Sequence, residues 1–188
     1  GALEQANNVA LSGFWQSHKY IELNPQLLQD LTLKQPYTEH QQGFIEHIAR
    51  VNSVAIHVRR GDYLANPRAL AKHGICSESY YQSAIEQVAQ QVENPIFFIF
   101  SDDPEWVKAN LKLPNAVFVS DEKFAQEIDL TLISKCKHQI IANSSFSWWG
   151  AFLNNEPNKV VVAPTPWFDK TDLMDMDISP PEWVKINK

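Results

Sequence analysis

The segment Arg59-Arg60-Gly61-Asp62 is the part of the sequence best suited to bind a negatively charged ligand. Guanidinium groups remain charged at physiological pH, and each can donate to two phosphate oxygens at once. Gly61 should allow the tight turn that a phosphate-binding loop of this kind needs. Arg59 and Arg60 are therefore candidate phosphate ligands. A surface ion pair between one arginine and Asp62 explains the same residues, whereas an adhesion signal of the Arg-Gly-Asp type fits poorly beside an apolar segment.

A second polar group, Ser101-Asp102-Asp103, directly follows an apolar run over residues 96–100. Asp103 stands before Pro104, and this order is typical of the N-cap and first residue of a helix. Asp102 is then free to accept hydrogen bonds from a guanine or a ribose hydroxyl. The paired carboxylates would also suit a cation, but no histidine or third carboxylate stands at ligand spacing nearby, so we predict no metal site.

A third polar group stands where a strand should end and a helix should begin. Its members are Asn143, Ser144, Ser145, Phe146 and Ser147. The free amides at a helix start, together with small hydroxyl groups, form a site that binds anions. Helix capping by Ser144 or Ser145 is the alternative, and it accounts for one serine rather than for the whole group.

His57 lies on the expected strand before Arg59, with its side chain opposite to that of Val58. A histidine in this place can be a hydrogen-bonded structural residue or a general base. The sequence leaves both interpretations open.

The elements that position these groups follow from the pattern of apolar residues after residue 53. We expect strands over residues 54–58, 96–100, 116–119, 139–142 and 159–162, and helices over residues 77–88, 104–111, 128–136 and 147–153. Strands that are apolar throughout and alternate with helices predict an α/β protein with a Rossmann-like parallel sheet and helices on both faces. Ligands of such folds bind at the carboxyl ends of the strands, where all three polar groups lie. Their convergence predicts a site for a nucleoside diphosphate.

The overall composition argues against several other classes of protein. With 44% hydrophobic residues, the chain of 188 residues can form a sizeable core, and a net charge of −6 argues against nucleic-acid binding. The sequence shows no signal peptide and no apolar stretch of membrane-spanning length. A serine hydrolase is excluded because no Gly-x-Ser-x-Gly elbow occurs. Cys76 and Cys136 are expected to be reduced core thiols, although one disulfide between them would also be compatible with the sequence.

Several segments, taken together and in order, resemble the bacterial α-1,2-fucosyltransferases of glycosyltransferase family 11. They are Gly13–Ser17 with Lys19-Tyr20, His57–Tyr63, Ser101–Asp103 with Trp106, Cys136–Ala151, Trp167-Phe168 and Trp183–Ile186. The segment Cys136–Ala151 is the most specific of these, and the resemblance extends over nearly the whole chain.

The resemblance implies a GT-B-type enzyme that transfers L-fucose from GDP-β-L-fucose to the 2-hydroxyl of a terminal galactoside, with inversion and without a metal or other cofactor. It identifies Arg59 as the residue that binds the donor's β-phosphate and stabilises it as it leaves, with Arg60 and Asp62 in support and His57 alongside the donor. The catalytic candidates are thus Arg59, His57 and Asp62. The candidate donor-binding residues are Arg59, Arg60, Asp102, Asn143, Ser144, Ser145, Phe146 and Ser147. Inversion also invites a general base, for which Asp62 and His57 are the visible candidates, and neither is assigned.

The same resemblance divides the chain. Residues 51–188 would form the Rossmann-like nucleotide-sugar-binding domain, with the C-terminal tail packed back onto it. Residues 1–50 would form a helical segment leading to a missing N-terminal acceptor-binding half, whose glycine-rich Gly-Leu-Gly-Asn-Gln motif does not occur in the sequence. An isolated GDP-binding module without transfer activity is therefore the alternative to a transferase, and a transferase for another nucleotide sugar is a third hypothesis.

The partners that the resemblance implies are GDP-fucose and a galactose-terminated glycan acceptor. A bacterial enzyme of this kind would act in the cytoplasm on a cell-surface polysaccharide. Peripheral association with the inner face of the bacterial membrane is a further expectation for the full enzyme.

Overall fold

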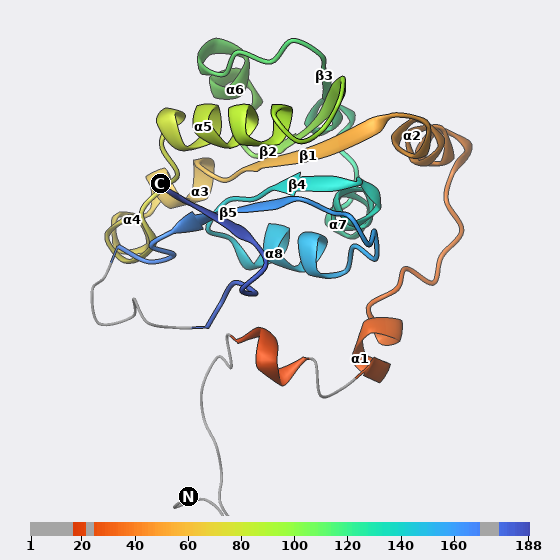
Figure 1. Cartoon of the computed structure of the whole chain (residues 1–188), viewed down its shortest axis with the longest axis horizontal. Helices are drawn as coiled ribbons and strands as arrows, with labels where there is room; N and C mark the ends of the chain where they lie inside the picture. Colours follow the sequence, from red (N-terminus) through yellow and green to blue (C-terminus); the bar gives the residue numbers. More distant parts are fainter. Residues whose placement is uncertain (1–16, 22–24, 170–176) are drawn as a thin grey trace, which may run out of the picture.

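A six-stranded parallel sheet forms the centre of the molecule, whose computed structural model describes residues 17–21, 25–169 and 177–188 (Figure 1). The strands are β1 (Asn52–Val58), β2 (Pro95–Ser101), β3 (Ala116–Phe118), β4 (His138–Ile140), β5 (Val161–Thr165) and β6 (Val184–Asn187). Their order across the sheet is β3-β2-β1-β4-β5-β6, which is the doubly wound order of the Rossmann fold. The predicted Rossmann-like parallel sheet is thereby confirmed.

Helices cover both faces of this sheet (Figure 1). The helices α5 (Glu78–Ala89) and α6 (Pro104–Asn110) pack on one face, and α2 (Glu39–Arg50), α7 (Gln126–Lys135) and α8 (Ser145–Phe152) pack on the other. The shorter elements are α1 (Pro25–Asp30), α3 (Gly61–Ala65), α4 (Pro67–His73) and the 3-10 helices η2 (His18–Tyr20) and η3 (Val119–Glu122). Within the described ranges, every helix is too short or too polar to cross a bilayer. This architecture fits the donor-binding half of a GT-B-type glycosyltransferase.

The sheet divides the core into two layers. Side chains alternate along β1, so Val54 and Ile56 pack with α5, whereas Ala55 packs with α2 and α7. The C-terminal tail adds to the second layer beside α8, where Trp148 Nε1 donates a hydrogen bond to the carbonyl of Ile178 at 2.8 Å. The described part of the C-terminal tail thus packs against α8.

A capping residue begins each of two helices, and the cap of α6, Asp103, was predicted from the sequence. At α5, the Tyr80 amide donates to Ser77 Oγ at 3.1 Å. At α6, the Trp106 amide donates to Asp103 Oδ1 at 3.2 Å, and Pro104 is the first helical residue. These starts were predictable because a cap satisfies amides within one turn of its own position.

The prediction of a final strand over residues 159–162 was wrong in two respects. The strand lies at Val161–Thr165, and β6 follows it as a sixth strand, with Val184 beside Val162 in the register. In β6, half-buried residues alternate with exposed ones, because it is an edge strand. It therefore lacks the continuous apolar run that marks the inner strands.

Element boundaries also shift around two of the polar segments. The strand β4 ends at Ile140 rather than at residue 142, and α8 begins at Ser145 rather than at residue 147, because Ser144 is its N-cap. The strand β3 ends at Phe118, since Val119 already belongs to η3.

The N-terminal part of the described chain includes α2, a twelve-residue helix that buries Ile48 in the same cluster as Ala55 and Phe98. The domain boundary placed after residue 50 stays a prediction, and the segment Gly13–Gln16 lies outside the described residues. Both cysteines are buried and free, as expected for reduced core thiols.

Candidate functional site

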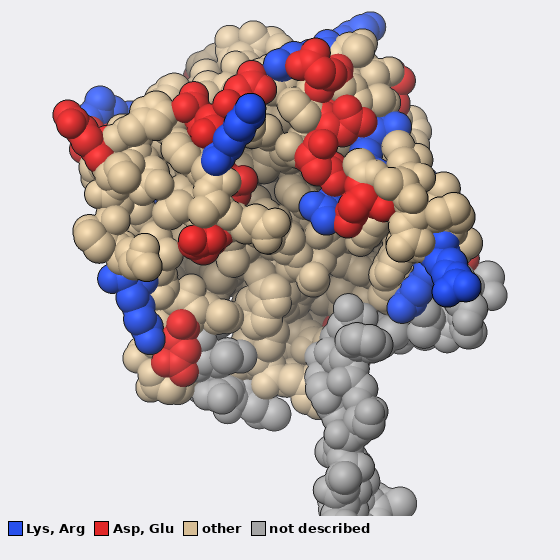
Figure 2. All heavy atoms as spheres, turned by 180° about the vertical axis from the view of Figure 1, so that it is seen from behind, with Lys and Arg blue, Asp and Glu red and all other residues tan. Residues whose placement is uncertain are grey.

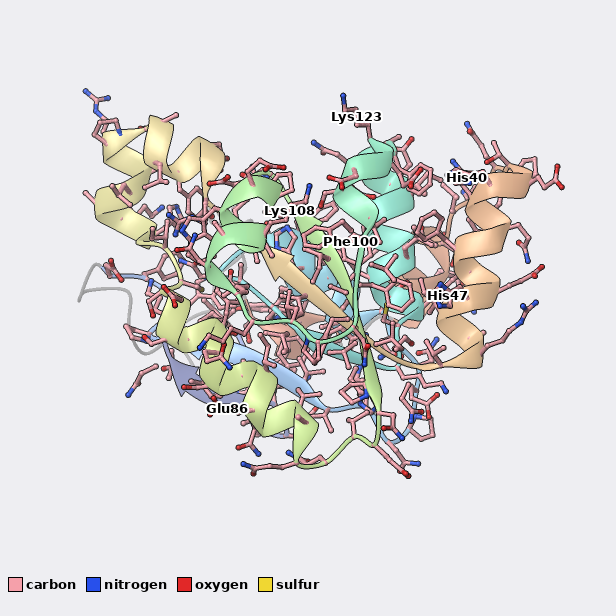
Figure 3. The ribbon with its side chains drawn as sticks, turned by 90° about the horizontal axis from the view of Figure 1, so that it is seen from above. His40, His47, Glu86, Phe100, Lys108 and Lys123 are labelled. Atoms are coloured by element: carbon pink, nitrogen blue, oxygen red, sulfur yellow. The ribbon has the colours of Figure 1, made fainter. Side chains whose placement is uncertain are left out.

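A pocket of about 410 Å³ opens at the carboxyl ends of the central strands. Its walls come from the loop after β1, the end of β2 and the starts of α7 and α8. The lining residues are His57, Arg59, Asp62, Tyr63, Phe100, Ser101, Asp102, Gln126, Asp129, Ser144, Ser145 and Phe146. In Figure 3 the labelled Phe100 marks the β2 wall of this pocket. The strand order reverses between β1 and β4, so the pocket occupies the place where open α/β sheets bind their ligands.

Arg59 carries the positive charge of the pocket and is held by two carboxylates. Its Nη2 donates to Asp62 Oδ2 at 2.5 Å, and its Nε lies 3.5 Å from Asp102 Oδ2. One third of the Arg59 side chain is exposed. The ion pair with Asp62 expected from the sequence therefore exists, and it lies in the pocket rather than apart from it.

Arg60 points away from the pocket. Its guanidinium carbon lies 3.9 Å from the centroid of the Trp106 ring, and its Nε lies 3.7 Å from Asp103 Oδ2. The guanidinium thus lies over the indole ring, at a distance typical of a cation–π contact. The structure does not bring Arg60 together with the other candidate donor-binding residues. Its side chain instead contacts Trp106 and Asp103, and so stabilises the loop after β1 on the side away from the pocket.

Asp102 supports the loop after β1 as well as lining the pocket. Its Oδ1 accepts a hydrogen bond from the Arg60 amide at 2.9 Å, while its Oδ2 faces Arg59. A Cβ atom at Gly61 would come within 3.3 Å of Asp102 Oδ2. Gly61 therefore permits a close approach at the start of α3, where the chain enters a helix without a positive φ angle.

The start of α8 forms the opposite wall. Ser144 Oγ accepts from the Phe146 amide at 3.3 Å, which confirms the capping interpretation for one serine. Ser145 is exposed beside it, and the Phe146 ring packs against His57 with centroids 5.4 Å apart. Ser144, Ser145 and Phe146 thus lie in the pocket, as expected of donor-binding candidates.

Two other candidates in this segment turn into the protein. Asn143 Nδ2 donates to the carbonyls of His73 at 2.7 Å and of Gly74 and Trp167 at 3.3 Å. Ser147 is fully buried, and its hydroxyl bonds to main-chain carbonyls of its own segment. Asn143 and Ser147 therefore shape the wall without lining the pocket.

His57 is a buried, neutral member of the pocket. Burial lowers its pKa to about 4, and the nearby charge of Arg59 acts in the same direction. Its Nδ1 has no hydrogen-bond partner among the described residues. A neutral imidazole that lines the pocket can serve a ligand as a hydrogen-bond partner, whereas its low pKa makes it a weak base.

Five lining residues are not among the predicted site residues: Tyr63, Phe100, Ser101, Gln126 and Asp129. Tyr63 donates its hydroxyl to the Asn143 carbonyl at 3.3 Å, and so bridges the two walls. Gln126 and Asp129 come from the first turns of α7. Burial raises the pKa of Asp129 to about 6, and its Oδ1 has no partner among the described residues. The signal in the sequence that could have pointed to Asp129 was its position as an acidic residue directly after Ile128, which is buried in the core.

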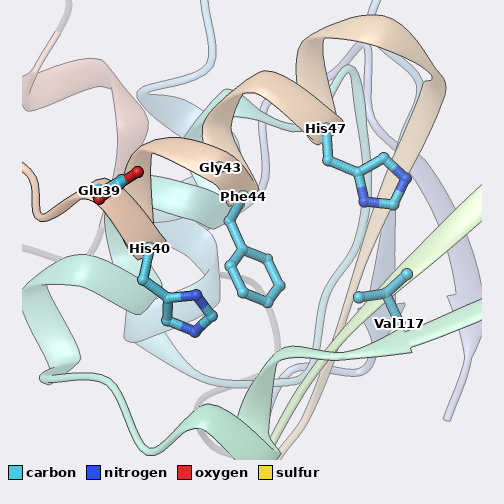
Figure 4. Close-up of a pocket in the computed structure, with 6 residues that line it drawn as sticks. All are labelled: Glu39, His40, Gly43, Phe44, His47 and Val117. Atoms are coloured by element: carbon cyan, nitrogen blue, oxygen red, sulfur yellow. The ribbon is translucent and has the colours of Figure 1, made fainter.

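A second cavity, of about 510 Å³, lies along α2 and shares no residue with the first (Figure 4). His40 and His47 both point from α2 toward it (Figures 3 and 4). His40 Nε2 bonds to Glu122 Oε2 at 2.6 Å, and its ring meets Phe44 edge to face. Among the described residues, no cluster of histidine, cysteine and acidic side chains could hold a metal ion.

The charged surface is mixed. On the face shown in Figure 2, lysine and arginine side chains lie scattered among aspartate and glutamate side chains. Arg59 is therefore a local positive charge on a protein whose net charge is −6.

Fold and pocket together define an α/β domain of the Rossmann type, with an arginine-containing pocket at its topological switch point. The profile of Glycosyl transferase family 11 matches residues 3–187, and the chain belongs to this family. The resemblance seen in the sequence is thereby confirmed.

Three relatives illustrate the range of the family. The chain is 41% identical over 187 residues to an alpha-1,2-colitosyltransferase of Escherichia coli, which covers 96% of this chain and 63% of the relative. It is 41% identical over 119 residues to the O-antigen biosynthesis glycosyltransferase WbnK of Escherichia coli, and this match covers 62% of the chain and 39% of the relative. It is 31% identical over 143 residues to the galactoside 2-alpha-L-fucosyltransferase SEC1 of Bos taurus, and this match covers 71% of the chain and 39% of the relative. The chain thus spans less than two thirds of the length of each of these relatives.

Proposed function

We propose that the protein transfers L-fucose from GDP-β-L-fucose to the 2-hydroxyl of a terminal galactoside, with inversion and without a metal. The observation that carries this proposal is the position of Arg59 in a pocket at the switch point of a family 11 domain. A galactoside 2-alpha-L-fucosyltransferase among the relatives supports the choice of reaction.

Glycosyl transfer of this kind leaves growing negative charge on the departing diphosphate. Arg59 supplies a fixed positive charge there, and the amides at the start of α8 supply further donors on the facing wall. Asp62 and Asp102 hold the guanidinium from two sides, which limits its motion before the donor binds. The preformed geometry stabilises charge in the transition state without a large rearrangement.

His57 is proposed as a hydrogen-bond partner of the donor rather than as the base. Its lowered pKa leaves it neutral and weakly basic at neutral pH. Asp62 is the other candidate, and its carboxylate is paired with Arg59. Neither residue is assigned to remove the proton from the acceptor hydroxyl.

Transfer of colitose is the second candidate function, because a colitosyltransferase is 41% identical to the chain over 187 residues. Colitose is L-fucose without its 3-hydroxyl. A site that hydrogen-bonds this hydroxyl would strongly reject the deoxy sugar, since its own polar groups would be left unpaired. Transfer rates with GDP-fucose and GDP-colitose, measured on the same galactoside, separate the two functions.

An isolated GDP-binding module is the remaining alternative, since the chain spans 63% of the length of the colitosyltransferase. Calorimetric titration with GDP and a transfer assay on the same preparation decide between them. Binding together with transfer supports the enzyme, binding without transfer supports the module, and absence of both contradicts the proposal.

A galactose-terminated glycan of the bacterial surface is proposed as the acceptor. A relative named as an O-antigen biosynthesis glycosyltransferase supports this class of acceptor. Action in the cytoplasm, with peripheral contact at the inner membrane face, is part of the same proposal.

A further inference from the structure

Two consecutive tyrosines of α5, Tyr80 and Tyr81, place their hydroxyls under the two loops of the pocket. The Tyr81 hydroxyl donates to the carbonyl of His57 at 3.2 Å. The Tyr80 hydroxyl donates to the carbonyl of Ile141 at 2.6 Å and lies 3.4 Å from that of Val162. Both side chains are fully buried.

These carbonyls lie where the two central strands part. The pairing of β1 with β4 ends at Ile56 opposite Ile140, and His57 and Ile141 are the next residues along each strand. At this point the sheet no longer fixes the distance between the strands. The two hydroxyls contact the first carbonyl beyond the ladder on each side, in place of the missing strand-to-strand hydrogen bonds.

Both anchored carbonyls lie close in sequence to pocket residues. His57 itself lines the pocket, and Arg59 follows two residues later. Ile141 precedes Ser144, the N-cap of α8, by three residues. A rotation of either anchored peptide group would therefore displace the arginine or the helix start.

The phenols are suited to this task at any physiological pH. Burial raises the pKa of Tyr80 and of Tyr81 well above the usual range, so both remain protonated donors. Their rings contact each other at 5.0 Å between centroids, which couples the two anchors through one rigid pair.

We infer that Tyr80 and Tyr81 are positioning residues, which set the spacing of the two pocket loops and thereby the affinity for the nucleoside diphosphate. This role rests on the proposed donor site, because it acts through Arg59 and the start of α8. Neither tyrosine lines the pocket.

The test uses Tyr80→Phe and Tyr81→Phe, which remove one oxygen each and keep the rings. We expect each to weaken GDP binding about tenfold in calorimetric titration well below the melting temperature, because part of the binding free energy is then used to restore the spacing of the two loops. Tyr37→Phe is the matched control, since this half-buried tyrosine lies before α2 and outside the pocket. It should leave GDP affinity unchanged.

A second measurement separates positioning from general stability. In an Arg59→Ala background, Tyr81→Phe should weaken GDP binding much less than in the unsubstituted chain, because its effect passes through the arginine. Unchanged GDP affinity in both folded tyrosine variants, with only a lower melting temperature, would overturn the inference. Loss of the folded state in both would also contradict it. Failure of the unsubstituted chain to bind GDP would instead contradict the proposed function.

Discussion

The loops after β1 and after β4 face each other across the pocket, yet they are held by different forces. In the β1 loop, Arg59 lies between the carboxylates of Asp62 and Asp102 and stays partly exposed. On the β4 side, Asn143 in the loop and Ser147 in α8 are buried and bond to main-chain carbonyls. One wall is therefore charged and accessible, and the other is neutral and fixed.

The difference assigns different tasks to the two walls. Partly exposed ion pairs contribute little to stability and are weakened by salt, so an arriving diphosphate can compete with Asp62 for Arg59. Buried hydrogen bonds are costly to break, so the β4 wall keeps its shape whether or not a ligand is present. The charged wall should carry most of the binding and catalysis, and the neutral wall should contribute mainly to stability and to the position of the amides at the start of α8.

Arg59→Ala should give the largest effect. We expect it to remove most transfer, with a loss of transition-state stabilisation on the order of several kcal/mol, because the departing diphosphate loses its fixed cation. Steady-state kinetics with GDP-fucose measure kcat/KM. Arg50→Ala, an exposed arginine paired with Glu46 on α2, is the control and should behave as the unsubstituted protein. Near-normal turnover of Arg59→Ala would refute the assignment of the charged wall.

Asn143→Ala should act on the other wall and mainly on folding. Removing its amide leaves the carbonyls of His73, Gly74 and Trp167 without this donor, which should cost about 2–3 kcal/mol in the free energy of unfolding. Urea unfolding measures the change. Asn52→Ala removes an exposed bond to the Glu93 carbonyl and should cost far less. Equal losses in the two variants would contradict the proposed rigidity of the β4 wall.

Asp129→Asn tests, through the pH dependence of stability, whether the Asp129 carboxylate of α7 is partly buried. The folded pKa of about 6 lies above the ordinary value of 3.8, so ionisation in the folded state is disfavoured and stability falls as pH rises between these values. Because the group is partly exposed, we expect the variant to be more stable by on the order of 1 kcal/mol at pH 8. The gain should vanish below pH 3.8. Melting temperatures across pH provide the measurement, and a gain independent of pH would contradict the burial of a charged Asp129.

Arg60→Lys should give the smallest effect and distinguishes the two arginines. Lysine lacks the planar group that lies on Trp106, so stability should fall by about 1 kcal/mol while GDP affinity changes little. Arg59→Lys is the matched substitution and should instead weaken GDP binding. If Arg60→Lys weakens GDP binding as much as Arg59→Lys, Arg60 is a phosphate ligand after all.

The sequence predicted the sheet and the place of the site because both depend on local patterns. Inner strands such as β1 and β2 are apolar on both faces, and the residues after them lie at one edge of any parallel sheet. The directions of Arg59 and Arg60 were not predictable, since the alternation of β1 ends at Val58 and α3 begins only at Gly61. Asp129 enters the pocket only because α7 packs beside β2, which is a tertiary contact.

The remaining misses have similar causes. The edge strand β6 has half-buried residues only at alternate positions and follows two prolines, so it lacks the continuous apolar run that predicted the inner strands. Asn143 and Ser147 belong to a polar segment that we interpreted as ligand-binding. Asn143 instead donates to carbonyls of distant segments, and Ser147 donates to a carbonyl at the start of α8. The tertiary contacts with those segments, and not the local sequence of residues 143–147, determine which polar side chains point into the protein.

Calorimetric titration of the unsubstituted chain and of Arg59→Ala with GDP and UDP tests the central claim most directly. A pocket at the switch point that holds a guanosine diphosphate through Arg59 predicts binding of GDP, weaker binding of UDP, and a large loss of GDP affinity on removal of the guanidinium. Absence of GDP binding at millimolar concentration, or equal GDP affinity with and without the Arg59 side chain, would contradict it.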